Sequence, residues 1–175
     1  GDIFVAESNG LIVSAATTSA GNGNIDIRTA AGAFTVSGAV SAHGSGDVTL
    51  VATGGLLTVN ATVNSTTGDI SLTGGTGVAH DASGDITSTG IGTITVAATT
   101  GNITMADGTV YATGSGNVSL TAATSIVLAE ITTTSSAVGL TATAGSITDT
   151  TAAETANITT SGTATLSAAT GIGVT

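Results

Sequence analysis

The chain has 175 residues, including 26 Gly, and it contains no Pro, Cys or Trp. A single Lys or Arg is set against eleven acidic residues, so the net charge is −10 and the chain offers no electrostatic footprint for nucleic acid or for an anionic membrane. The lack of Cys excludes a disulfide framework and a thiolate zinc site, whereas 41% hydrophobic residues and only 7% charged residues exclude a disordered class.

An alternation of apolar and other residues begins at Ile3 and Val5, directly after Gly1 and Asp2, and returns along the whole chain. The later members of this first column are Ile25 and Ile27, Val48 and Leu50, Ile70 and Leu72, Ile94 and Val96, Val118 and Leu120, and Val138 and Leu140, and Leu166 opens an eighth, weaker unit. The step from one unit to the next varies little along the chain. A local period of two predicts a strand with one buried face in each unit.

Two further columns keep the same step inside each unit. The second column is Phe34 and Val36, Leu57 and Val59, Ile103 and Met105, Ile126 and Leu128, Ile147, and Ile172 with Val174. The third column is Val40, Val63, Ile86, Val110, Ile131 and Ile158. Each column is rich in β-branched residues and is bounded by Gly, Asn, Asp or Ser-Thr corners, which is typical of short strands.

Three columns with one period predict an all-β fold, a right-handed parallel β-helix (β-solenoid) with three short strands per coil and seven to eight coils of about 23 residues. We expect residues 1–175 to form a single β-solenoid segment. The residues predicted to be buried are Leu50, Leu57, Val59, Leu72, Val96, Ile103, Val118 and Leu120. The residues predicted to face outward, in columns of hydroxyl groups, include Thr49, Thr58, Ser71 and Thr95.

Asn or Asp side chains occupy the corner that precedes the first strand of most units. These residues are Asp2, Asn24, Asp47, Asp69 and Asn117. Such side chains tolerate tight turns and accept hydrogen bonds from local backbone amides. The recurring Gly-[Asp/Asn]-[Ile/Val] pattern is therefore interpreted as a structural corner.

The units GDVTLVATGGLLTVNATV, GNITMADGTVYATGSGNVSL and GDISLTGGTG resemble the haemagglutinin-type repeats of large secreted bacterial adhesins, such as filamentous haemagglutinin and related two-partner-secretion exoproteins. Units in this chain are longer and less regular than the best-known repeats of that family. The resemblance implies a right-handed β-helix, a cell-surface or extracellular location, and roles in adhesion and biofilm cohesion. The repeat is already under way at Gly1 and still continues at Thr175, so we expect a piece of a longer chain.

Few residues are candidates for chemistry. No nucleotide-binding, zinc-protease or serine-hydrolase motif occurs. Arg28 is expected on the surface, and His43 is expected to be exposed in a Gly-rich corner. His80 follows Leu57 by one repeat length, which places it on a core column, and we expect Val78 to make the core contact while His80 packs at a corner. We therefore predict no enzyme activity and no catalytic, cofactor-binding or metal-binding residues.

The acids Asp81, Asp107, Glu130 and Asp149 are expected near the corner after the second strand in successive coils. Stacked carboxylates repel one another and favour a bound cation, so a weak calcium site stays open as an alternative to a solvated corner. Five Asn-x-Ser/Thr sequons occur, and they are interpreted as by-products of the corner pattern; they lie at Asn60, Asn64, Asn102, Asn117 and Asn157.

The favoured function is that of a structural or adhesive rod, a stalk segment of a bacterial surface adhesin or biofilm matrix protein. Its expected partners are polysaccharide or other copies of the rod, with no nucleic acid and no insertion into a membrane. The alternatives are a carbohydrate-binding or carbohydrate-cleaving β-helix, a filament subunit that stacks end to end, and an ice-binding threonine ladder. The last alternative needs a regular face, which Val127 and Gly139 interrupt.

Overall fold

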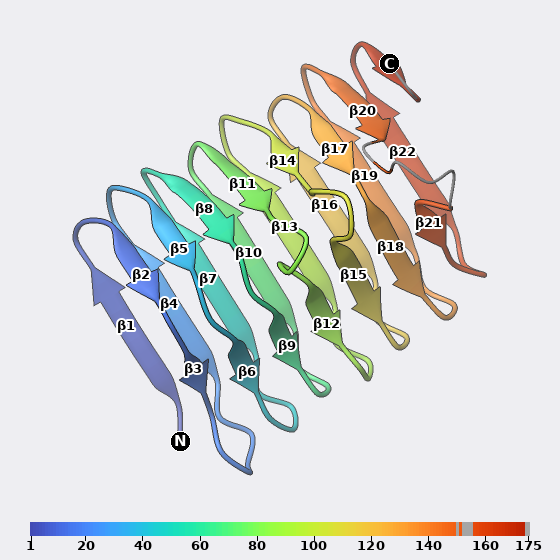
Figure 1. Cartoon of the computed structure of the whole chain (residues 1–175). Coiled ribbons are helices and arrows are strands. Elements are labelled where there is room, and N and C mark those ends of the chain that lie inside the picture. The colour runs from blue at the N-terminus through green and yellow to red at the C-terminus, as the bar shows by residue number, and fades with distance from the viewer. Residues whose placement is uncertain (150, 152–155, 174–175) are drawn as a thin grey trace.

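The chain winds into a parallel β-solenoid whose coils lie side by side along one axis, as Figure 1 shows. This computed structural model describes residues 1–149, 151 and 156–173. Each complete coil contributes one strand to each of three sheets, and every pairing between strands is parallel. The predicted fold class, with three short strands per coil, is therefore confirmed.

The three sheets are named in chain order. Sheet one contains β1 (Ile3–Glu7), β4 (Ile25–Thr29), β7 (Val48–Ala52), β10 (Ile70–Gly74), β13 (Ile94–Ala98), β16 (Val118–Ala122), β19 (Val138–Ala142) and β22 (Ala164–Ala168). Sheet two contains β2 (Leu11–Val13), β5 (Phe34–Val36), β8 (Leu56–Val59), β11 (Gly77–His80), β14 (Ile103–Thr104), β17 (Ile126–Leu128), β20 (Ser146–Asp149) and β23 (Gly171–Ile172). Sheet three contains β3 (Ala16–Thr17), β6 (Val40–Ala42), β9 (Val63–Ser65), β12 (Ile86–Ser88), β15 (Val110–Thr113), β18 (Glu130–Thr133) and β21 (Ile158–Thr159).

The register of sheet one follows the first apolar column. Val48 of β7 pairs with Ile25 of β4 and with Ile70 of β10, and the matching steps run to Ala164. The second column is confirmed in the same way from Phe34 to Ile172, whereas Val174 lies outside the described residues. The eighth unit is shown by β22, which pairs Leu166 with Leu140.

A narrow aliphatic core runs through the middle of the coils. All eight residues predicted to be buried are at most 1% exposed. The outward Thr and Ser residues of the same strands are half-buried or exposed. From β7 onward, the last inward position of each sheet-one strand is filled by Ala or Gly, as at Ala52, Gly74 and Ala98, where the chain turns toward sheet two.

The corners that join sheet three to sheet one are termed return corners, and they explain the Gly-[Asp/Asn] pattern. Gly46, Gly68, Gly92 and Gly116 stack from coil to coil, and a Cβ atom on any of them would overlap the carbonyl oxygen of the previous glycine in the stack. None of these four glycines has positive φ. Glycine is therefore needed here for the close approach of backbones, and not for a left-handed conformation.

Where an Asp or Asn follows a glycine of the return corners, as Asp47 follows Gly46 and Asp69 follows Gly68, its side chain binds the next coil. The side-chain oxygen of Asn24 accepts a hydrogen bond from the Asp47 amide, and the Asp47 carboxylate accepts one from the Asp69 amide, both at 2.8 Å. Asp69 continues the series by accepting from the Thr93 amide at 2.7 Å. The expectation of local turn bonds was wrong: these side chains satisfy backbone donors one coil further along.

Hydroxyl groups complete the return corners from inside. Ser65 donates to the Gly46 carbonyl at 2.7 Å, and Ser88 donates to the Gly68 carbonyl at 3.1 Å. Both hydroxyls are buried, and both end sheet-three strands that pair with each other. The return corners at Gly46 and Gly68 are thus closed by hydrogen bonds on both sides of the glycine, as expected for buried polar groups.

The third apolar column needs one correction. Tyr111, and not Val110, pairs with Ile86 and Ile131 and points into the core, where it is fully buried. Val110 is half-buried and pairs with Glu130. The alternation is set by Thr113, whose inward hydroxyl donates to the Gly116 carbonyl at 2.6 Å, so the inward positions of β15 are Tyr111 and Thr113.

The corner between sheet two and sheet three, termed the middle corner, is where coil length varies. It comprises 60–62 in one coil, the longer stretches 81–85 and 105–109 in the next two, and position 129 alone in the coil after those. The long middle corners belong to the two coils that contain the large buried side chains His80, Met105 and Tyr111. Long middle corners and these side chains thus occur together, although Phe34 is fully buried in a coil with the short middle corner 37–39.

Candidate functional site

The single Arg lies on the outer face of sheet one. Its Nε atom is 2.7 Å from Oδ1 of Asp26 on the same strand, and its side chain is 47% exposed. Such exposed ion pairs contribute little to stability, typically about 0.2–1 kcal/mol. Arg28 is therefore a surface residue, as predicted, and its charge is matched within its own strand.

The two His residues lie in different parts of the coil. His43 follows β6 in an exposed return corner, as predicted. His80 ends β11 on the opposite side of sheet three and is only 5% exposed. Among the described residues, no group of three or more His, Cys, Asp or Glu side chains could hold a metal ion.

Val78 takes the core position opposite Leu57 and Ile103, which confirms one part of the prediction. His80 packs at a corner, as predicted, because it contacts the Gly84 carbonyl of the corner 81–85, but its core column needs correction: it is in register with Val59 and not with Leu57. Its ring is buried beside the middle corner. Counting one average repeat from Leu57 failed because the coil that joins β8 to β11 is shorter than average, so Leu57 reaches its partner already at Val78.

His80 and Tyr111 form a polar contact inside the aliphatic core. The Tyr111 hydroxyl lies 2.6 Å from Nε2 of His80, and Nδ1 of His80 lies 2.9 Å from the Gly84 carbonyl oxygen. A carbonyl oxygen accepts only, so Nδ1 carries the proton and Nε2 accepts from the tyrosine. The rings meet edge to face, with centroids 5.2 Å apart. With His80 neutral, the imidazole ring, the Gly84 carbonyl and the Tyr111 hydroxyl therefore all have hydrogen-bond partners.

Burial holds His80 in this neutral form. Desolvation lowers the pKa of His80 from 6.5 to about 4, against the opposing effects of the Gly84 carbonyl and the carboxylates of Asp81 and Asp85. Burial also raises the pKa of Tyr111 well above its ordinary value. Both side chains consequently stay uncharged over the neutral pH range.

The lowered pKa predicts a loss of stability in acid. His80 binds a proton near pH 6.5 in the unfolded chain but only near pH 4 in the folded chain. The stability that neutral His80 gives the folded chain is therefore fully present above pH 6.5 and is lost as the pH falls to about 4. We expect His80 to lower the free energy of unfolding by about 3 kcal/mol between pH 7 and pH 4.

Urea unfolding at several pH values measures this loss. The double variant His80→Leu/Tyr111→Phe replaces the pair with apolar groups of similar size and should lack this component of the pH dependence. The control His43→Gln, in an exposed corner, should retain it. Identical pH profiles for the double variant and the unmodified chain would contradict the assignment.

The four predicted corner acids are not brought into one group. Asp81 follows β11, Asp107 lies between β14 and β15, and Asp149 ends β20. Glu130 begins β18, in sheet three, where it pairs with Val110. The Asp149 carboxylate accepts from Thr151 and from Asn157. The expectation that all four share the corner is therefore wrong for Glu130, since the middle corner of its coil is a single residue.

The five sequons differ in what their Asn side chains do. Asn102 and Asn117 accept hydrogen bonds from amides of the next coil, those of Ser125 and Ala137, at 3.0 Å. The Asn157 amide donates to the Ala129 carbonyl and to Asp149. Asn64 is half-buried on sheet three, and Asn60 is exposed in a middle corner. Three of these Asn side chains thus have structural roles.

The outer face of sheet one is an uncharged field of hydroxyl groups from β7 to β22. Two outward columns run along it, and their hydroxyl-bearing members are Thr49, Ser71, Thr95, Ser119 and Thr165 in one column and Thr73, Thr121, Thr141 and Ser167 in the other. None of these hydroxyls bonds to another described residue, whereas corner hydroxyls such as that of Thr67 bind backbone carbonyls. Val51, Ala97 and Gly139 interrupt the columns.

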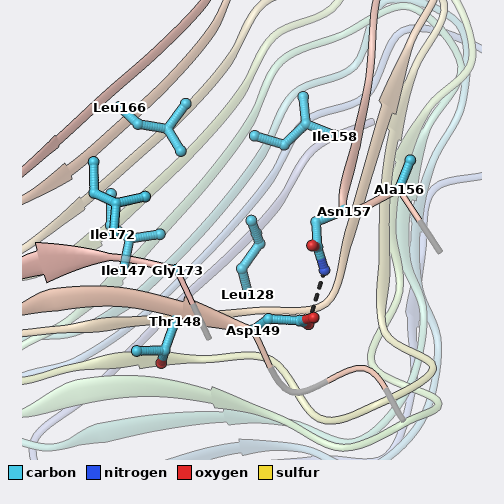
Figure 2. A pocket seen from close by; sticks show the side chains of 10 residues that line it. All are labelled: Leu128, Ile147, Thr148, Asp149, Ala156, Asn157, Ile158, Leu166, Ile172 and Gly173. Carbon is cyan, nitrogen blue, oxygen red and sulfur yellow. Dashed lines mark hydrogen bonds between the residues drawn. The ribbon is translucent and has the colours of Figure 1, made fainter. Parts of the chain in front are cut away.

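An apolar hollow of about 280 Å³ lies at the last coils of the described chain, and Figure 2 shows the side chains around it. Leu128, Ile147, Ile158 and Leu166 are core residues of the final coils, so the hollow is a continuation of the core. Asn157 donates to Asp149 at 2.9 Å at its edge. The Asp149 and Asn157 side chains at the edge of the hollow are thus paired with each other.

No family model, curated protein or solved structure matches the chain. Its function is therefore inferred from its own residues. In the described part of the chain, no helix is long and apolar enough to cross a membrane. Two features contrast: the hydroxyl columns recur on the outer face of sheet one, whereas the buried His80–Tyr111 contact occurs at a single place.

The His80–Tyr111 contact and the second hydroxyl column of sheet one were not predicted from the sequence. The contact joins residues that lie in different coils, and the register that brings them together depends on the long middle corners. The second hydroxyl column is visible in the sequence, because Thr73, Thr121 and Ser167 each lie two positions after a hydroxyl residue of the other column, namely Ser71, Ser119 and Thr165.

Proposed function

We propose that the chain is a non-enzymatic, extracellular rod, a stalk segment of a bacterial surface adhesin or biofilm matrix protein. The observation that carries the proposal is the stack of coils with variable corners and with an uncharged hydroxyl face on sheet one. A stack in which each coil contacts its neighbours is a spacer whose length grows with coil number. The resemblance of its repeats to those of secreted adhesins supports the location.

The charge distribution supports a contact role for sheet one. Acidic side chains lie in the return corners, as Asp47 and Asp69 do, and in the middle corners, as Asp81 and Asp107 do. The outward positions of sheet one from β7 to β22 are free of charge. We propose that this face makes weak, repeated hydrogen bonds to polysaccharide, with avidity arising from the number of coils.

A carbohydrate-cleaving β-helix is the alternative. Glycoside cleavage needs a positioned acid and base, and the transition state also needs its charge stabilised. Arg28 is paired with Asp26, and the corner acids are distributed over separate coils. These placements favour a rod over an enzyme.

One experiment tests both proposals. The purified chain is incubated with a panel of neutral and acidic polysaccharides, with and without calcium, and both retention on the polysaccharide and new reducing ends or unsaturated products are measured. We expect weak retention that increases when several copies are joined, and no cleavage products. Turnover that disappears in Asp81→Asn or Asp107→Asn would establish the enzyme instead.

Matched surface variants identify the contact face. Thr95→Lys and Ser119→Lys place a charged, bulky side chain on exposed positions of sheet one, and we expect them to weaken retention on neutral polysaccharides. Thr159→Lys adds the same charge on the exposed face of sheet three and should leave retention unchanged. Equal losses in all three variants would show that the binding does not involve sheet one.

A further inference from the structure

A single cross-coil contact ties the middle corner 81–85 to the next coil. His80 ends the sheet-two strand that precedes this corner, Gly84 lies within it, and Tyr111 belongs to sheet three of the following coil. His80 contacts both of the others, at 2.9 Å to the Gly84 carbonyl and at 2.6 Å to the Tyr111 hydroxyl. One imidazole ring thus connects two sheets and two coils.

Further hydrogen bonds converge on the same corner. The Asp85 carboxylate accepts from the Val110 amide at 2.8 Å, and the Thr109 hydroxyl donates to the Asp81 carbonyl at 2.9 Å. Asp81 also caps the corner by accepting from the Ser83 amide at 2.8 Å. Gly84 is buried, whereas Asp81 and Ser83 are exposed. The corner therefore encloses the ring beneath a surface that water reaches.

The neutral ring is the one form that fits these partners. A protonated imidazole donates from both nitrogens, so Tyr111 would have to accept, and its own hydroxyl hydrogen would then have no acceptor among the described residues. The ionisable groups around the ring are Tyr111, Asp81 and Asp85, while Asp107 is exposed in the next middle corner. Of the two carboxylates that act on the ring, Asp81 is exposed and Asp85 is half-buried.

We propose that His80, Tyr111 and the corner 81–85 form a proton-operated latch, in which proton uptake by His80 breaks the Tyr111 contact and opens the corner. The charged ring moves toward the carboxylates of Asp81 and Asp85, because a charge in the aliphatic interior is strongly unfavourable. Opening stays local, since a solenoid coil is held mainly by its nearest neighbours. The latch goes beyond the proposed rod function and makes one point along the rod sensitive to acid.

Hydrogen exchange along the whole chain tests the latch. Exchange is measured by mass spectrometry at about pH 7 and about pH 5, with correction for the intrinsic pH dependence of exchange. From a histidine pKa of 6.5 in the open form and about 4 in the closed form, exchange through this opening should increase roughly twentyfold. The increase should be confined to β11, the corner 81–85 and β15, while β7 and β8 keep their protection.

Two variants and one control make the test decisive. His80→Leu/Tyr111→Phe should abolish the local acid response, and His43→Gln should leave it intact. Tyr111→Phe removes the donor to Nε2, so the response should shift to higher pH, and the His80 ring resonances in an NMR titration should shift with it. A uniform acid response along the rod, or an unchanged local response in the double variant, would overturn the proposal.

Discussion

Gly92→Ala should lower the free energy of unfolding by about 3 kcal/mol or more, because no space exists for a methyl group in the stacked return corners. A Cβ atom at Gly92 would overlap the Gly68 carbonyl oxygen of the previous coil and also approach the Ser88 hydroxyl. The first of these is backbone, which cannot rotate away. Relief would therefore require the two coils to separate, with loss of the Ser88 hydrogen bond to Gly68.

Gly139→Ala is the matched control for this effect. Gly139 lies on the outer face of β19, an added Cβ would meet nothing within 4 Å, and its φ is not positive. Replacement there restricts the unfolded chain without strain in the folded one, so we expect a change between zero and a gain of about 1 kcal/mol. Urea unfolding of both variants gives the comparison, and equal losses would show that the glycine stack has no special steric role.

Leu57→Ala should cost about 2–5 kcal/mol through the lost burial and the cavity that remains. Leu57 is fully buried in sheet two, with Phe34 of the previous coil and Val78 of the next coil as its neighbours in the column. Both neighbours lie in strands that are held by parallel pairing, so they can move little to fill the cavity.

The adjacent residue provides the control for the cavity. Leu56 has the same side chain one position earlier in β8, but it is 37% exposed and points away from the core. Leu56→Ala should therefore change the free energy of unfolding by no more than about 1 kcal/mol. A smaller loss for Leu57→Ala than for Leu56→Ala, in urea or thermal unfolding, is incompatible with the described register.

The sequence was sufficient to predict the architecture because it carries two kinds of periodicity, an alternation of apolar residues within each strand and a recurrence of that alternation from coil to coil. Alternation of Val48 and Leu50 predicts a strand, and its recurrence at Ile70 and Leu72 predicts a parallel neighbour. In the third column the same reasoning failed for Val110. Sheet-three strands are very short, so the alternation is too brief to determine its own phase, and a shift of a single position exchanges inward and outward side chains.

The roles of the corner residues also lay beyond the sequence. Gly-Asp is a common turn pair, and nothing in the pair itself distinguishes a glycine needed for positive φ from one needed for close stacking. Only the structure shows that Gly68 is needed for close stacking, because a Cβ atom there would overlap the Gly46 carbonyl oxygen of the previous coil. Likewise, the partner of Asp47 is the amide of Asp69, one coil away, and local turn chemistry does not reveal such a bond.

Paired strands have a similar separation along the sequence in every coil, and this has a consequence for how the chain folds. Sheet-one partners stay about one repeat apart along the sequence, even in the shortest step, from Val118 to Val138, and in the longest, from Val138 to Ala164. Closing a loop of that size has nearly the same entropic cost for every coil, because the cost rises only with the logarithm of loop length. Each folded coil can serve as a template for the next, so a chain of this kind can add coils in order during synthesis. A longer chain then needs more folding steps, but the entropic cost of each step stays nearly the same.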